Sequence, residues 1–213
     1  MNSSEALEKL LPAFEKFYTV KRQGVVCPFD AEAEFCLHTE KYVLVKAAKI
    51  ADIDSNEFVY FSSQKKLDFS LLKELSLTAW NEGLKKVQPY SGHRNSDITL
   101  IVIADSLDSD VKKYAGKIKF SKNYMLGLYG WSNFKLAVLG IERGETVSNW
   151  HGRDLKKLFV KTGLMSLNVF DIKFILLTLE EYNDSIVNYY CCDCSAFCRL
   201  CFLWFVACKT VGY

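Results

Sequence analysis

A run of acidic and hydroxyl side chains follows the most apolar stretch of the chain. Asp105, Asp108 and Asp110 come directly after residues 98–104 (ITLIVIA), which the pattern predicts to be a central strand covered on both faces. Ligands of open α/β sheets often sit beyond the carboxyl ends of strands, and Mg²⁺ prefers carboxylate oxygens. One hypothesis is therefore a metal-dependent phosphoester hydrolase. The simpler interpretation is that these residues cap the following helix, because acids stabilise a helix N-terminus.

Two histidines lie close to arginines and are the other candidates for catalysis. His93 precedes Arg94, and His151 lies two residues before Arg153. A histidine can act as an acid or a base near neutral pH, and an arginine can hold a phosphate. Nothing in the spacing shows that the two histidines meet, and a histidine in a polar loop is usually a solvated side chain.

Cysteines gather at the end of the chain. Six of the eight lie in the last 23 residues, where Cys192, Cys194, Cys198 and Cys201 form a C-x-C pair and a C-x₂-C pair. Four thiolates could bind zinc or an iron–sulfur cluster. Only three residues separate the two pairs, however, and no glycine or proline supplies the tight turns that paired knuckles need. A metal-binding tail therefore stays one alternative among several.

The same tail differs from the rest of the chain in charge. Residues 164–213 carry 8 charged side chains in 50 residues, against 44 in the first 163.

Residues 186–208 are long enough to cross a bilayer, which takes about 20 residues. Asp193 and Arg199 near the middle would cost roughly 2.5–3.5 kcal/mol each, so a stable span is not favoured. We predict a globular domain over 1–163 and a tail over 164–213, which a shifted reading frame would also explain.

Hydrophobic periodicity and turn-forming residues divide the first 163 residues into elements. Their order, α-ββ-α-β-α-βββ-α, predicts a single α+β domain with one mixed or antiparallel sheet and packed helices. The predicted elements are a helix over 4–18, strands over 41–50 and 57–62 joined by a turn at 52–56, a helix from 68 to 88, a strand over 98–104, a helix from 108 to 118, strands over 121–131, 134–142 and 145–149, and a helix over 151–162.

Three short motifs stand in this domain: Ser121-x-x-Tyr124, Gly130-Trp131 and Gly152-Arg153-x-Leu155. On these motifs the segment from residue 42 to residue 159 resembles an uncharacterised prokaryotic domain family of unknown function. The resemblance implies no activity, cofactor or partner. It ends where the composition of the chain shifts.

Composition and missing motifs narrow the function further. A net charge of +2 gives no argument for nucleic acid, and the lysine pairs fall on the polar sides of predicted helices. Phosphate-binding loops, dinucleotide fingerprints and nucleophile elbows do not occur in the sequence. The N-terminus has no export signal, which predicts a cytoplasmic protein. We expect a non-catalytic binding or interaction domain without a cofactor. The alternatives are an Mg²⁺-dependent hydrolase and a Zn²⁺-binding or membrane-associated tail.

Overall fold

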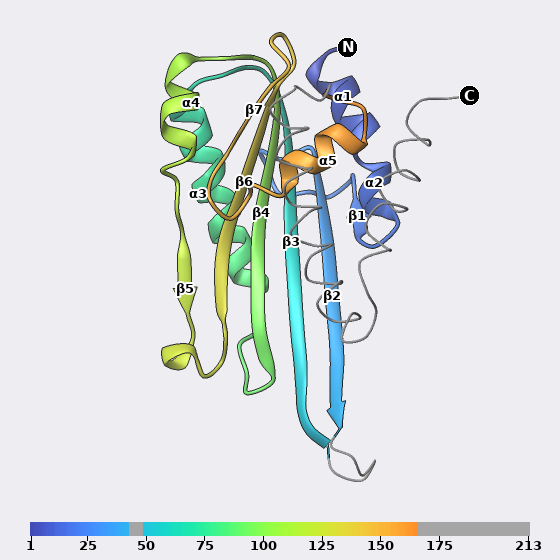
Figure 1. Cartoon of the computed structure of the whole chain (residues 1–213), viewed down its shortest axis with the longest axis vertical. Coiled ribbons are helices and arrows are strands. Elements are labelled where there is room, and N and C mark those ends of the chain that lie inside the picture. The colour runs from blue at the N-terminus through green and yellow to red at the C-terminus, as the bar shows by residue number, and fades with distance from the viewer. Residues whose placement is uncertain (43–48, 166–213) are drawn as a thin grey trace, which may run out of the picture. The chain divides into compact units, whose positions relative to one another are not determined.

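The computed structural model describes residues 1–42 and 49–165, and the structural statements below concern those residues (Figure 1). A seven-stranded sheet runs through the centre in the order β1-β2-β3-β4-β6-β5. β5 pairs with the beginning of β6, and β7 pairs with the end of β6. The strands are β1 (Thr19–Lys21), β2 (Ala31–Tyr42), β3 (Lys49–Leu67), β4 (His93–Leu107), β5 (Ser121–Asn123), β6 (Trp131–Gly140) and β7 (Glu145–Ser148).

Helices cover both faces of this sheet (Figure 1). One apolar core lies under α3 and α4, and the other lies under α1, α2 and α5. The helices are α1 (Ser3–Leu10), α2 (Pro12–Glu15), α3 (Phe69–Lys86), α4 (Ser109–Ala115) and α5 (Leu155–Lys161), with a short 3-10 helix η1 (Met125–Gly127). The predicted α+β class with a single mixed sheet is confirmed.

The three central strands are parallel, and the helices explain why. The chain passes from β3 through α3 to β4, and from β4 past α4 to β6, so each connection returns to the same end of the sheet. A central parallel strand is buried on both faces, which requires an unbroken apolar run. Residues 98–104 of β4 meet this requirement apart from Thr99, and every one of them is fully buried. The predicted central strand is therefore confirmed.

The first hairpin differs from its prediction. The expected turn at 52–56 lies inside β3, and β2 and β3 pair without interruption from Ala31↔Phe61 to Lys41↔Ala51. Residues 52–56 have the composition of a turn, but the ladder between β3 and β2 continues through them. β2 begins at Ala31, ten residues before the predicted strand over 41–50. Its signal was the alternation of small or apolar residues with glutamates over 31–35.

Two other elements are shorter than predicted. The helix expected over 4–18 is divided into α1 and α2 at Pro12, which lacks the N–H that a continuous helix would need. The strand expected over 121–131 is limited to the three residues of β5. The chain then forms η1 and a loop, because four of residues 125–130 adopt a positive φ that a strand cannot contain.

Candidate functional site

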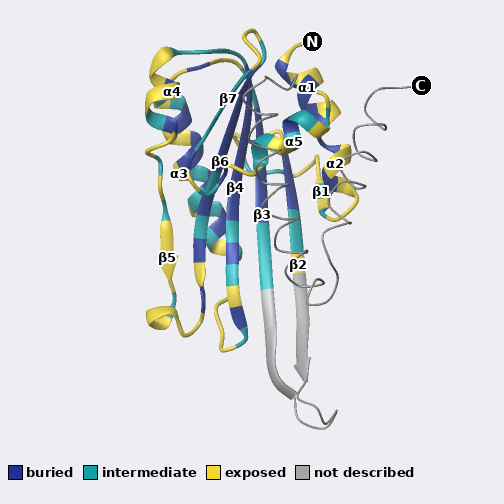
Figure 2. Cartoon of the chain, viewed as in Figure 1, coloured by how far each residue is buried: buried dark blue, intermediate teal, exposed yellow. Residues whose placement is uncertain are grey.

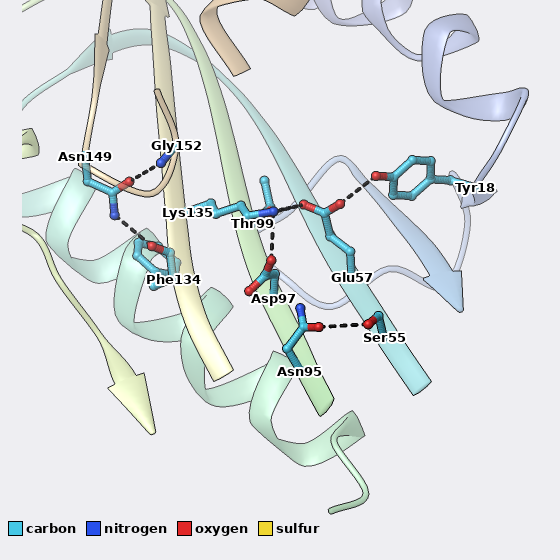
Figure 3. Close-up of polar contacts among 10 residues, drawn as sticks. All are labelled: Tyr18, Ser55, Glu57, Asn95, Asp97, Thr99, Phe134, Lys135, Asn149 and Gly152. Carbon is cyan, nitrogen blue, oxygen red and sulfur yellow. Dashed lines mark hydrogen bonds and ion pairs between the residues drawn. The ribbon is translucent and has the colours of Figure 1, made fainter. Parts of the chain in front are cut away.

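Polar side chains replace the apolar core toward the amino ends of the parallel strands. Glu57 of β3, Asp97 and Thr99 of β4 and Lys135 of β6 lie on the sheet face that also carries α1 (Figure 3). Glu57 and Asp97 are register partners on neighbouring strands, as are Thr99 and Lys135. With Tyr18, which follows α2, these residues form what we call the carboxylate–lysine cluster.

The cluster is closed by short contacts among its own members. The Lys135 ammonium lies 2.9 Å from Asp97 Oδ2 and 3.2 Å from Glu57 Oε1. The Thr99 hydroxyl donates to Glu57 Oε1 at 2.7 Å, and the Tyr18 hydroxyl donates to Glu57 Oε2 at 2.6 Å. Both oxygens of Glu57 are thus satisfied within the cluster, and the residue ties the segment after α2 to the sheet (Figure 3).

The protonation states of the cluster favour a positioning role. Burial alone would lower the pKa of Lys135, but Glu57 and Asp97 outweigh it and raise that pKa. Burial and the negative charge of Glu57 raise the pKa of Tyr18. At neutral pH the lysine is therefore charged and the tyrosine neutral, whereas a general base or a nucleophile would need the opposite shift. The cluster holds elements together, and neither Lys135 nor Tyr18 is activated for catalysis.

His93 is buried on the opposite face of the sheet, at the start of β4. Its Nδ1 lies 2.7 Å from the carbonyl oxygen of Tyr129, which can only accept, so Nδ1 carries the proton. Its Nε2 lies 2.8 Å from the Ser96 hydroxyl. The ring also meets the edge of Tyr124 at 5.8 Å between centroids. His93 therefore anchors the segment from Tyr124 to Trp131.

That segment, residues 124–131, is an apolar loop that projects into solvent beyond β5 (Figure 2). Met125 is 62% exposed, Leu126 is 102% exposed and Leu128 is 76% exposed. The backbone is nevertheless closed, because Tyr124 N–H donates to the Gly130 carbonyl at 3.0 Å and Tyr129 N–H donates to the Tyr124 carbonyl at 3.1 Å. Large apolar side chains are thus presented on an ordered support, with Met125 and Leu126 both in the left-handed region.

Gly130 closes the base of the apolar loop. Its φ is +79°, and a Cβ at this position would collide with the carbonyl oxygen of Arg94. Only glycine combines this backbone conformation with such a close approach. The motif Gly130-Trp131 therefore has a structural reason, as does Tyr124, whose hydroxyl lies 3.0 Å from the Ser132 hydroxyl.

The three predicted aspartates lie at the N-termini of two helices. Asp105 Oδ1 accepts from the backbone N–H of Ser3 at 2.6 Å, at the start of α1. Asp108 is the N-cap of α4 and accepts from Ser109 N–H at 2.8 Å, while Asp110 lies in the first turn of that helix. Among the described residues no group of three His, Cys, Asp or Glu side chains is placed to hold a metal ion. The hydrogen bonds from backbone N–H groups to Asp105 and Asp108 support the capping interpretation. The metal-dependent hydrolase stays a prediction.

The remaining candidates are not brought together. His93 and Asp105 lie near opposite ends of β4, twelve residues or about 40 Å apart at the rise of a strand. His151 lies between β7 and α5. The candidate thiols Cys192, Cys194, Cys198 and Cys201 lie outside the residues that the structure describes. Within the described part of the chain, no helix has the length and apolar character needed to cross a membrane.

A family model described as a domain of unknown function, DUF8052, matches residues 2–161. The chain belongs to this family. The resemblance to an uncharacterised domain family is thereby confirmed, and the DUF8052 match includes both the carboxylate–lysine cluster and the apolar loop. No curated protein and no solved structure matches the chain.

Sequence reasoning missed both features of the DUF8052 domain. The cluster joins residues from four separate segments, so no local spacing could indicate it. The predicted strand over 121–131 includes the apolar loop, because residues 124–131 (YMLGLYGW) are aromatic and aliphatic. Its signal was the pair of glycines at 127 and 130, three residues apart, which is typical of a turn rather than a strand.

Proposed function

We propose that the DUF8052 domain of this chain is a non-catalytic interaction module that contacts its partner through the apolar loop. The observation that carries the proposal is the full exposure of Leu126 on a loop whose backbone is closed and anchored. Water-exposed leucine and methionine side chains gathered at one place are typical of an interaction site.

The anchoring of the loop supports this proposal. Left-handed backbone at a residue with a side chain costs about 1–2 kcal/mol, and two consecutive residues adopt it here. The buried histidine, its serine partner and the glycine at the base of the loop all maintain this shape. Such strain is found at functional sites, where the surrounding structure enforces it.

A photo-crosslinking experiment tests the interaction surface. Replacing Leu126 with photoreactive benzoylphenylalanine, in cells that make the protein, is expected to give discrete covalent adducts on irradiation. The matched control places the same group at Leu77, an exposed leucine on α3 that is 39% exposed. Discrete adducts from position 126 and only background from position 77 are expected. Equal adduct patterns from the two positions would count against the loop as the contact surface.

We also propose that the module folds without the tail. The core under α1 and α5 includes Phe159 and Leu164, and Met165 packs against it. A chain truncated after Met165 is therefore expected to unfold cooperatively, with a midpoint within a few degrees of the full chain. A chain truncated after Lys161 lacks Leu164 and should be about 2 kcal/mol or more less stable. Thermal unfolding followed by circular dichroism measures both. An unfolded 1–165 chain beside a cooperative full chain would place the boundary elsewhere.

A further inference from the structure

The apolar loop stands in a strongly basic part of the chain. Residues 111–141 contain six lysines and neither aspartate nor glutamate. Lys122 lies two residues before the loop and is exposed. The Lys122 ammonium lies 5.4 Å from the centre of the Tyr124 ring, at the first residue of the loop. One side of the loop base therefore carries a cation.

A second segment adds positive charge at the same base. Gly130 packs against the backbone of Arg94, so this exposed arginine lies beside the loop. Residues 83–96 likewise contain no acidic residue, and the nearest aspartate along the strand, Asp97, is paired with Lys135 at 2.9 Å. An apolar tip is thus combined with a base of cations from two separate segments.

This combination has the chemistry of an anionic lipid surface. Apolar side chains enter the boundary between headgroups and acyl chains, while lysine and arginine meet the anionic headgroups. Tyr129 and Trp131 flank the tip and are 36% and 39% exposed. Tyrosine and tryptophan prefer the depth of a bilayer at which one end is apolar and the other wet.

We infer that the apolar loop docks the domain on an anionic bilayer, with Met125, Leu126 and Leu128 inserted and the surrounding cations on the headgroups. The inference rests on the proposed function, since it names the partner of that same loop. Each lysine near such a surface adds attraction that salt screens, so binding falls as the ionic strength rises.

Sedimentation with vesicles tests the apolar tip. The full chain is mixed with vesicles of phosphatidylcholine alone, or of phosphatidylcholine with roughly one-third phosphatidylserine. We expect at least about tenfold stronger binding to the anionic vesicles. The double variant Leu126→Ser, Leu128→Ser should lose about tenfold or more of it, because two inserted side chains are removed. Leu77→Ser is the matched control and should bind like the wild type.

A charge-reversal set tests the cationic base. Arg94→Glu and Lys122→Glu together should abolish the preference for phosphatidylserine. Lys65→Glu and Lys73→Glu change the net charge equally at exposed lysines elsewhere in the chain, and should retain the preference. An equal loss in both sets would show that the total charge, and not the loop base, attracts the vesicles, and would overturn the inference.

The two proposals fail in different ways. Vesicle binding that persists unchanged in the double leucine variant overturns the membrane inference, because another part of the chain then carries the binding. Protein adducts from position 126 without vesicle binding overturn it as well, but leave the interaction module in place. Background adducts alone at position 126 and no vesicle binding overturn both. Unfolding midpoints of the variants, which should match the wild type, show that each loss comes from the surface.

Discussion

Replacing Asn149 with alanine is expected to destabilise the domain by about 4 kcal/mol or more. The side chain is 2% exposed and makes four hydrogen bonds to the backbone. Its Oδ1 accepts from the N–H groups of Leu136 and Gly152 at 3.0 and 2.9 Å. Its Nδ2 donates to the carbonyl oxygens of Phe134 and Ile118 at 2.8 and 3.1 Å. Each unsatisfied buried group costs roughly 1–3 kcal/mol, so the sum is large.

Urea unfolding followed by fluorescence measures this loss. Asn123→Ala is the matched control, because Asn123 is an exposed asparagine on β5 and its replacement should change stability by less than about 0.5 kcal/mol. Asn149→Asp keeps the two acceptor contacts but turns an oxygen toward the carbonyls of Phe134 and Ile118. That variant should also be strongly destabilised. Equal midpoints for the alanine variants at 149 and 123 would contradict the role of Asn149.

Asn149 also explains one of the family motifs. Its bond to Gly152 N–H holds the turn after β7 against β6, where a Cβ on Gly152 would collide with the backbone of Leu136. The motif Gly152-Arg153-x-Leu155 thus begins at a close contact between two backbones. The sequence shows the glycine but not its neighbour, because the contact joins segments that only folding brings together.

The parts of the fold that were predicted correctly depend on local signals. The central strand at 98–104 is apolar except for Thr99, and α3 has Asp68 as its N-cap and ends before Pro89. Such signals depend only on residues within or next to a single helix or strand. The prediction did not determine that β3, β4 and β6 are parallel, which follows from the positions of α3 and α4 between them.

The candidate site was harder to predict than the central strand or α3, because one sequence signal can correspond to two different roles. Aspartates after a strand suggested a metal site, yet the structure uses Asp105 and Asp108 as caps of two helices. An isolated cap and a metal ligand have the same sequence signal, a carboxylate at the start of a helix. The apolar loop had the composition of a strand, and only its backbone conformation, set by glycines and by the buried His93, makes it a projecting surface.

Lys135→Met is expected to destabilise the domain by about 2 kcal/mol at neutral pH. The lysine is the cation between Glu57 and Asp97, which are register partners on adjacent strands and have only 17% of their side chains exposed. Its removal leaves two like charges directly opposite each other in a half-buried place. Methionine keeps the apolar stem of the side chain, so packing changes little. Urea unfolding measures the loss.

A double variant separates charge from packing in this cluster. Lys135→Met combined with Glu57→Gln removes one of the two facing carboxylates, so it should recover part of the stability lost in Lys135→Met. An additive further loss would show that the ion pairs are not the source of the effect. The matched control is Lys122→Met on β5, an exposed lysine whose removal should change stability by less than about 0.5 kcal/mol.

The pH dependence of stability gives an independent check of the same cluster. The folded state raises the pKa of Lys135 through its carboxylate neighbours, and burial together with Glu57 raises the pKa of Tyr18. A raised pKa in the folded state means that the stabilisation is complete below the unfolded value, about 10 for both groups. It is then lost as the pH rises through the folded values. Stability should therefore decline above about pH 10, and less steeply in both Tyr18→Phe and Lys135→Met than in the wild type. An alkaline decline of unchanged steepness in both variants would mean that these two groups are not what couples folding to pH, since each variant deletes one of the protons whose release the cluster opposes.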